Sequence, residues 1–496
     1  MHIESHLDVD VIAHEATDRM TCMLQLVAPT PPTAAARPGQ TLIIVLDRSG
    51  SMTGPPLEAA KQSIHALLRR LAPQDRFGLV VFDDQAQVLI PVRSMPEHDL
   101  PVVHQLVEQT YAGASTNLHA GYSLALREAR RALRKKGEAA DAATILLISD
   151  GHANHGVTDP DRLRQMADLA YDLDTVTSTT IGLGLGYDET VLAAIAVGGS
   201  GNHRFAADAD ELPATLAEEA GAVLDKSVLA ATIRVTGCDG HLTAVGVPQD
   251  LPARMEDDAT VITVGDLYAG ERRNILVRLN SAPLAELGLA TIAELTVEFT
   301  ALPEQREHRI TVPVTVNVVP GDEAAGRVPA PIVVVEELLA ETASAKAEAS
   351  RQVRDGDTDA ARTSLGRASR SLDSLHKALD VLRRHGELDE TSATDLQRLL
   401  STESDEIESI TTDLDTMPTE YTSKTAMSSA TRSRTGRRTS GSDTEPPCPQ
   451  CGETLLPIMW GLPMSDPGPG VILGGCCVPF DEPTHGCKAC GWEGTL

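Results

Sequence analysis

Continuous apolar segments alternate with amphipathic segments between about residues 41 and 225, and this alternation limits the possible folds more than any other feature of the chain. The apolar segments have the length of buried strands, and the amphipathic segments have helical spacing. We expect strands at 41–46, 77–82, 144–149 and 176–181, and helices at 57–71, 117–136, 160–172, 188–197 and 210–225. Such an order is typical of a doubly wound, mainly parallel sheet, whose ligands bind beyond the carboxyl ends of the strands.

Three loops at expected strand or helix ends carry carboxylate and hydroxyl side chains. The first strand is followed by Asp47, with Ser49 and Ser51 at alternate positions after it. A second loop offers Thr116 before a helix, and a third places Asp150 after another strand. Hard oxygen ligands of this kind suit Mg²⁺, and also Mn²⁺ and Ca²⁺. Two carboxylates and three hydroxyls leave coordination positions open, so the ion can accept a carboxylate from outside the chain.

The order of these residues resembles the metal-ion-dependent adhesion site of the von Willebrand factor A (VWA) family, which reads DxSxS, then Thr, then Asp in a DG turn. Asp47, Ser49 and Ser51 match the first element, Thr116 the second and Asp150 the third. DxSxS alone is a weak signal, and the order of all three elements on strand ends carries the resemblance. The resemblance implies a VWA domain over residues 39–226. It also implies that the hydroxyls bind the ion directly or nearly so, while the aspartates often act through water.

A metal-dependent hydrolase is one alternative to such a binding protein. A phosphatase of the haloacid dehalogenase type needs a second Asp where this chain has Ser49, and no GxxxxGK[ST] loop is present. His152 and His155 lie beside the site in sequence, but two histidines do not make a mechanism. Asp83 and Asp84, at another strand end, are interpreted as a solvated turn. We therefore expect a protein that is not an enzyme.

The flanking regions extend this domain to a multidomain α/β, β and α protein. Period-two strands fill residues 1–38 and 227–322, and we expect them to form one β-sandwich into which the VWA domain is inserted. Residues 331–417 have apolar residues at helical spacing, which predicts a helical bundle or hairpin. Residues 418–446 are rich in Ser and Thr and are expected to be a disordered linker. Their basic cluster could also contact nucleic acid or an acidic partner, including the chain's own acidic helix, although a solubilising tether is favoured; it comprises Lys424, Arg432, Arg434, Arg437 and Arg438.

Two CxxCG elements near the C-terminus predict a structural zinc site. Two residues between thiols let both sulfurs face one tetrahedral metal, and the pair resembles the knuckles of a zinc ribbon over residues 447–496. The expected ligands are Cys448, Cys451, Cys487 and Cys490, while Cys476, Cys477 and His485 leave ligand swapping open. Thiolate ligands in a chain with no export signal indicate a reducing compartment.

Charge and hydropathy narrow the range of partners. The formal net charge of −29 argues against nucleic acid or an anionic membrane surface as the main partner. No apolar run approaches the ~20 residues that span a bilayer, and the N-terminus lacks the features of a signal peptide. A cytoplasmic location is therefore expected, which disfavours a surface adhesin, the other alternative. The resemblance suggests an adaptor of an intracellular ATPase, signalling or stress complex that binds an acidic residue of a partner protein. The partner and the oligomeric state stay open.

Overall fold

A computed structural model describes residues 1–30, 38–134, 142–151, 154–302, 305–385 and 390–434, together with short strands between Arg437 and Gly494. The chain divides into two compact units, Met1–Arg438 and Thr439–Leu496. None of the described helices is long and apolar enough to cross a membrane. In the second unit the described strands are β18 (Leu456–Trp460), β19 (Ile472–Gly475), β20 (His485–Gly486) and β21 (Glu493–Gly494), and β17 (Arg437–Thr439) lies at the division.

The expected α/β alternation forms a six-stranded sheet of order β6-β5-β4-β7-β8-β9. Its parallel strands are β4 (Thr41–Asp47), β5 (Arg76–Phe82), β7 (Ala143–Ser149), β8 (Val176–Leu183) and β9 (Ser200–Ala206). At one edge β6 (Ala86–Ser94) pairs antiparallel with β5. The strands β4, β7 and β8 are buried along their whole length, as the continuous apolar runs predicted.

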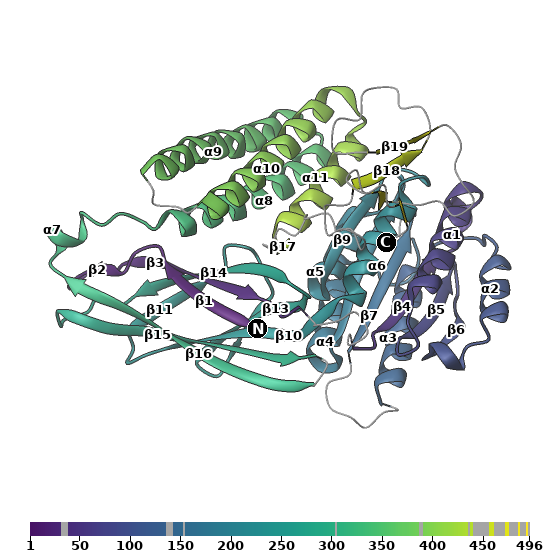
Figure 1. Cartoon of the computed structure of the whole chain (residues 1–496), viewed down its shortest axis with the longest axis horizontal. Coiled ribbons are helices and arrows are strands. Elements are labelled where there is room, and N and C mark those ends of the chain that lie inside the picture. The colour runs from purple at the N-terminus through teal and green to yellow at the C-terminus, as the bar shows by residue number, and fades with distance from the viewer. Residues whose placement is uncertain are drawn as a thin grey trace. The chain divides into compact units, whose positions relative to one another are not determined.

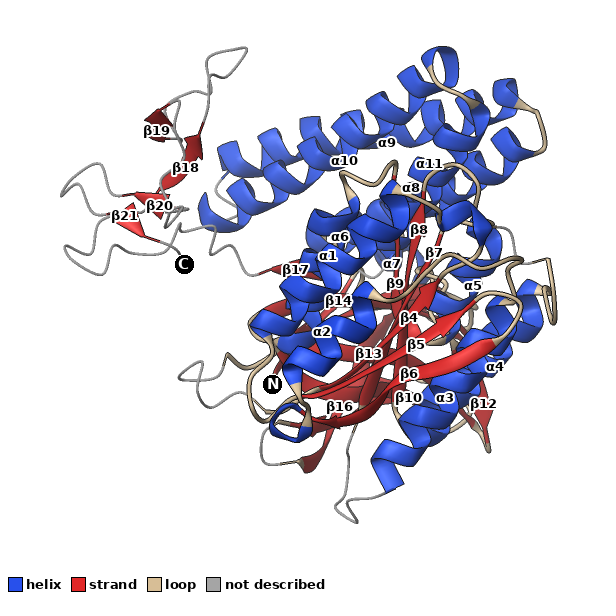
Figure 2. Cartoon of the chain, turned by 90° about the vertical axis from the view of Figure 1, so that its right-hand side faces the viewer, coloured by secondary structure: helices blue, strands red, loops and turns tan. Residues whose placement is uncertain are grey.

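Helices cover both faces of this sheet, because successive residues of each strand point to opposite sides (Figure 2). Leu42, Ile44 and Leu46 of β4 share a hydrophobic core with residues of α1 (Pro55–Arg70), α2 (Leu100–Glu108) and α6 (Leu212–Leu224). Ile43 and Val45 share the opposite core with residues of α3 (Leu118–Arg134), α4 (Pro160–Asp174) and α5 (Glu189–Gly198). The carboxyl ends of the parallel strands are left at one edge.

Two further sheets share a single hydrophobic core, to which β3 contributes Leu24 and β10 contributes Ile233. One sheet has the order β1-β3-β14-β11, comprising β1 (His2–Leu7), β3 (Arg19–Val27), β14 (Glu271–Ser281) and β11 (Leu242–Gly246). The other has the order β12-β13-β10-β15-β16-β2, comprising β12 (Ala253–Glu256), β13 (Ala259–Tyr268), β10 (Lys226–Gly237), β15 (Gly288–Ala301), β16 (Arg306–Val319) and β2 (Val11–Ala13). The N-terminal strands thus pair with strands that follow the α/β domain in sequence.

A helical layer follows, as the apolar spacing predicted (Figure 1). After the short α7 (Gly321–Ala324) come α8 (Pro331–Arg354), α9 (Thr358–His385), α10 (Glu390–Thr416) and α11 (Thr419–Arg434). Leu365, Leu372, Leu400 and Ile407 lie in the common core of the layer. Val333 of α8 packs against Met23 of β3 and Leu276 of β14. The layer is therefore joined to one of the β-sheets.

The expectation of a disordered linker over residues 418–446 is wrong for residues 419–434, which form α11. The segment has few large apolar side chains, but Ala426 and Ala430 are buried and let α11 lie close to α8. Several of its polar groups find partners within the fold. Thr431 donates to a main-chain carbonyl one turn back, and Arg432 lies 2.6 Å from Glu406. Part of the basic cluster thus contacts the chain's own acidic helix.

A buried ion pair joins the α/β domain to the β-sheets at the amino ends of the parallel strands. The Nζ atom of Lys226 lies 2.5 Å from Oδ2 of Asp266 and 2.7 Å from the hydroxyl of Thr144. Thr177 of β8 also donates to Asp266. Both charged side chains are 1% exposed. Their charges are therefore compensated by each other, by hydroxyl groups and by the main-chain N–H of Ala230, which donates to Oδ1 of Asp266.

Removing one partner of this pair tests its contribution. Lys226→Met should lower the free energy of unfolding by about 3–5 kcal/mol, because Asp266 would be left as an unpaired buried charge. Urea unfolding measures this loss. Arg309→Met, which removes an exposed partner of Glu298, is the matched control and should cost about 1 kcal/mol or less. Equal losses in the two variants would contradict the role of the buried pair.

Candidate metal centre at the carboxyl edge of the parallel sheet

The structure brings the five oxygen-bearing residues predicted from sequence to one edge of the sheet. Asp47 ends β4, and Asp150 directly follows the neighbouring strand β7. The main-chain N–H of Ser49 donates to Oδ1 of Asp47 at 2.8 Å. The hydroxyls of Ser49 and Ser51 lie 3.1 Å apart, and Ser51 donates to Oδ1 of Asp150 at 2.7 Å. Two adjacent strand ends thus form one connected polar cluster.

Gly151 shows that the hydroxyl of Thr116 borders the same space. A methyl group on its α-carbon would lie 3.0 Å from Oγ1 of Thr116, 3.4 Å from Oγ of Ser51 and 3.7 Å from Oγ of Ser49. Three hydroxyl oxygens therefore converge beside a residue without a side chain. The main-chain N–H of Thr116 donates to Asn154, which fixes the second loop against the third.

Hydrogen bonds between the loops hold this arrangement. Ser149, the last residue of β7, donates to Oδ2 of Asp47 at 2.5 Å. The N–H of Gly50 donates to the carbonyl of Ala114 at 2.8 Å, and the N–H of Gly113 donates to the carbonyl of Arg48 at 2.6 Å. Main-chain hydrogen bonds therefore join the first two loops. They fix the distance between the side chains that the two loops carry.

Asp83 also belongs to the site, contrary to the interpretation of residues 83 and 84 as a solvated turn. Asp84 is exposed, but Asp83 is 6% exposed, and its carboxylate lies 3.0 Å from the guanidinium of Arg48. Its Oδ2 also fills the space where Gly113 would carry a side chain, since a Cβ there would come within 2.1 Å. Asp83 follows β5, the strand next to β4, and this position in the sheet order was the signal that could have identified it.

The electrostatics of the site suit a cation. Asp47 is fully buried, and burial raises its pKa despite hydrogen bonds from Ser149 and Ser49. Burial raises the pKa of Asp150 to about 6, and the nearby charge of Asp47 acts in the same direction. A divalent ion would compensate both carboxylates. Among the described residues no three or more His, Cys, Asp or Glu side chains are grouped to hold a metal, so hydroxyls would complete the ligand set here.

The other predicted site residues are not tested by this geometry. His152 lies outside the described residues, and His155 is exposed, with its N–H donating to the carbonyl of Thr116. The cysteines of the predicted zinc site and their possible substitutes also lie outside the described residues: Cys448, Cys451, Cys476, Cys477, Cys487 and Cys490. The zinc site therefore stays a prediction.

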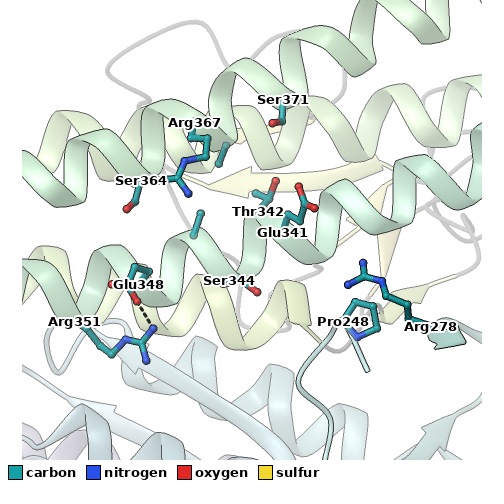
Figure 3. A pocket seen from close by; sticks show the side chains of 12 residues that line it. Pro248, Arg278, Glu341, Thr342, Ser344, Glu348, Arg351, Ser364, Arg367 and Ser371 are labelled. Carbon is teal, nitrogen blue, oxygen red and sulfur yellow. Dashed lines mark hydrogen bonds and ion pairs between the residues drawn. The ribbon is translucent and has the colours of Figure 1, made fainter. Parts of the chain in front are cut away.

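A large cavity elsewhere, between α8 and α9, does not contain these residues (Figure 3). It has a volume of about 550 Å³ and is lined by arginine, glutamate and hydroxyl side chains. Arg351 pairs with Glu348 on the same helix, and Arg278 lies 3.0 Å from Glu337. Since most of its arginines are already paired with carboxylates, the cavity does not define a strong anion site.

Comparison with known proteins agrees with this geometry. Residues 42–152 match the family model of the von Willebrand factor type A domain, and the chain is a VWA domain-containing protein. The uncharacterized protein sll0103 of Synechocystis sp. is 32% identical over 161 residues, which cover 32% of this chain and 36% of that protein. The E3 ubiquitin-protein ligase WAV3 of Arabidopsis thaliana is 26% identical over 279 residues, covering 52% of this chain and 34% of that protein. The chain thus spans about a third of the length of these curated relatives.

A solved structure extends the likeness beyond the VWA domain. The von Willebrand factor type A protein from Catenulispora acidiphila covers 76% of this chain and 88% of its own, with a TM-score of 0.61 and 17% identity. At this identity the likeness concerns the fold alone. It supports a multidomain architecture in which a mixed, mainly parallel VWA-like sheet is combined with additional β-sheets and C-terminal helices.

Adding a methyl group at Gly151 tests the geometry of the centre. Gly151→Ala should weaken Mg²⁺ binding by about tenfold or more, equivalent to about 1.4 kcal/mol, because the new methyl displaces the hydroxyl of Thr116 and occupies the space beside that of Ser51. Isothermal titration measures the affinity. Gly321→Ala is the control, since a Cβ there meets nothing within 4 Å. Unchanged affinity in Gly151→Ala would show that the three hydroxyls do not form the ion site.

A buried histidine on β9, two strands from β7 in the same sheet, predicts that the stability of the protein depends on pH. His203 on β9 is 0% exposed, and burial lowers its pKa to about 3. A histidine in the unfolded chain takes up its proton near pH 6.5. Below about pH 6.5 the unfolded state therefore binds more protons than the folded state, and the free energy of unfolding decreases as the pH falls. His203→Gln should remove up to about 1.4 kcal/mol per pH unit from the slope of unfolding free energy between about pH 6 and 4. Urea unfolding at several pH values measures this slope. An unchanged slope in His203→Gln would show that His203 does not cause the pH dependence. His155→Gln, at an exposed position, is the control and should keep the wild-type slope.

Proposed function

We propose that this chain is a non-enzymatic protein that binds an acidic residue of a partner protein through a divalent cation, Mg²⁺ or the similar Mn²⁺ or Ca²⁺. The ligands are Asp47, Ser49, Ser51, Thr116 and Asp150. VWA domains typically mediate metal-dependent protein interactions. The observation that carries the proposal is the convergence of three hydroxyls, the buried carboxylate of Asp47 and the half-buried carboxylate of Asp150 on one open space at the carboxyl edge of the sheet.

The chemistry of this ligand set favours a carboxylate from outside. Hydroxyl ligands carry no charge, and the carboxylate of Asp47 is already engaged by Ser149 and by the N–H of Ser49. An ion held in this way keeps much of its positive charge and has coordination positions to spare. A partner's Asp or Glu would complete the coordination sphere and gain a short, charge-compensated contact.

Hydrolysis is less well supported by the same residues. The hydroxyls of Ser49 and Ser51 contact each other, and Ser51 contacts Asp150, so neither is paired with a histidine base among the described residues. Ser49 also stands where a haloacid dehalogenase-type phosphatase needs its general acid. A cation here would therefore serve recognition.

The remaining modules complete the proposal. The pairing of β3 with β14, and of β2 with β16, supports a VWA domain inserted into a β-sandwich. Residues 447–496 would form a zinc ribbon held by Cys448, Cys451, Cys487 and Cys490. We place the protein in the cytoplasm, as an adaptor in an intracellular complex, on the charge and the cysteine pattern of the sequence.

Metal-switched binding tests the function. Wild-type protein should bind Mg²⁺ in isothermal titration and should retain its partner from lysate with Mg²⁺ but release it with EDTA. Asp47→Ala should lose both, because it removes the carboxylate on which Ser49 and Ser149 are organised. Asp84→Ala, an exposed neighbour of the site, is the matched control and should behave as wild type. Retention of the same proteins by Asp47→Ala would refute metal-mediated recognition.

The hydrolase alternative has its own test. Turnover of generic phosphate esters in the presence of Mg²⁺ should be absent from wild-type protein. Robust turnover that is abolished in Asp47→Ala would replace the binding function with an enzymatic one.

A further inference from the structure

Helix α11 is anchored to the VWA domain by a buried carboxylate. Glu189, at the start of α5, is 4% exposed, and it accepts hydrogen bonds from the hydroxyl of Ser423 at 2.9 Å and from Nζ of Lys424 at 3.0 Å. Burial by itself raises the pKa of Glu189, but Lys424 and these hydrogen bonds outweigh it and lower the pKa below its usual value. Arg354 of α8 adds a further positive charge at 3.6 Å. The glutamate is therefore a charged anchor point for the helical layer.

Aromatic contacts extend the anchor to the loop between β8 and α5. The Nζ atom of Lys424 lies 4.6 Å from the ring centroid of Tyr187, which is a favourable cation–π distance. Tyr421 packs edge-on against Phe205 of β9, with ring centroids 5.7 Å apart. Tyr187 itself is fully buried. One turn of α11 thus covers the loop residue Tyr187 from outside.

The same tyrosine lies against β8, the neighbour of the strand whose last residue, Ser149, supports Asp47. Its ring occupies the space beside Gly182, where a Cβ would come within 2.1 Å of ring carbon. Gly182 is paired in register with Ser149, whose hydroxyl holds Oδ2 of Asp47. Tyr187 therefore backs β8 at the residue that pairs with Ser149, and Ser149 in turn holds one metal-site carboxylate.

A second contact leads from this loop to the other carboxylate. Gly186, next to Tyr187, lies so close to the main-chain carbonyl of Asp150 that a Cβ there would come within 2.9 Å. A shift of this loop would therefore move the main chain of Asp150 or remove the contact that holds it in place. Asp150 is thus in direct packing contact with a loop that α11 holds from its other side, and Asp47 is connected to the same loop indirectly, through Ser149 and Gly182.

We propose that α11 acts as a latch on the metal centre, so that its seating on the VWA domain and the cation affinity of the site are coupled. This inference rests on the proposed function, since it requires the cation. When α11 is seated on the VWA domain, its residues Lys424 and Ser423 fix α5 and Tyr187 in the position that aligns Ser149 and Asp150. Because coupling is reciprocal, a bound cation in turn stabilises the seated helix.

Hydrogen exchange of the amides of residues 419–434 tests the coupling directly. In full-length wild-type protein, Mg²⁺ should slow this exchange several-fold, and it should have no effect in Asp47→Ala. Lys424→Met should weaken Mg²⁺ binding by about tenfold, within the usual range of coupling between sites, and should abolish the effect of Mg²⁺ on α11. Ser423→Ala, a milder change in the same anchor, should shift both quantities in the same direction by a smaller factor.

The matched control removes an ion pair elsewhere in the helical layer. Arg362 of α9 pairs with Asp415 of α10 at 2.7 Å on an exposed surface, so Arg362→Met should leave Mg²⁺ affinity and its effect on α11 unchanged. If wild-type protein binds Mg²⁺ but α11 exchanges at the same rate with and without it, the latch is wrong and the proposed function stands. If wild-type protein binds no Mg²⁺, the proposed function itself fails.

Discussion

The register between β4 and β7 is the constraint on which the rest of the site depends. Parallel pairing of Leu46 with Ile148 places Asp47 beside Ser149, and the hydroxyl of Ser149 then reaches the carboxylate of Asp47. A shift of one residue would turn each of these side chains to the opposite face of the sheet. The register is strongly specified, because both strands are buried on both faces by two separate hydrophobic cores. Stability of the sheet and geometry of the centre therefore have the same origin.

Buried ion pairs take a large part in joining the modules of this chain. Aromatic residues make up 3% of the sequence, so few large side chains are available for the contacts between modules. Lys226 and Asp266, on two strands of one β-sheet, bind the hydroxyls of Thr144 and Thr177 in the α/β domain, and Glu189 and Lys424 link that domain to α11. Within the helical layer, Lys346 links α8 to α10 through Glu403. Such pairs tolerate little misplacement, because a charge without its partner is costly to bury. They favour one arrangement of the modules over others that would bury similar apolar surface.

The sequence predicted those parts of the fold that depend on repeated apolar patterns, and missed parts that depend on isolated contacts. Continuous apolar runs identified β4, β5, β7 and β8, since strands buried on both faces leave a strong signal. The edge strand β6 was missed because it alternates burial and contains Pro91. The order of Asp, Ser and Thr residues on strand ends was enough to select the five residues that the structure brings together. Asp83 was missed because its position after β5 was interpreted as a solvated turn, and its partner Arg48, in the loop after the neighbouring strand β4, is not adjacent in sequence.

The Ser- and Thr-rich composition of α11 led to the expectation of disorder. The same composition has a consequence for the release of this helix from the rest of the fold. The apolar side chains that it buries are mainly the methyl groups of Ala426 and Ala430, each worth only about 0.8 kcal/mol of burial. A detached α11 would therefore expose little apolar surface of its own, and its Ser, Thr and basic side chains would be readily hydrated. Opening this part of the molecule would carry a small risk of aggregation, in contrast to the release of an ordinary amphipathic helix.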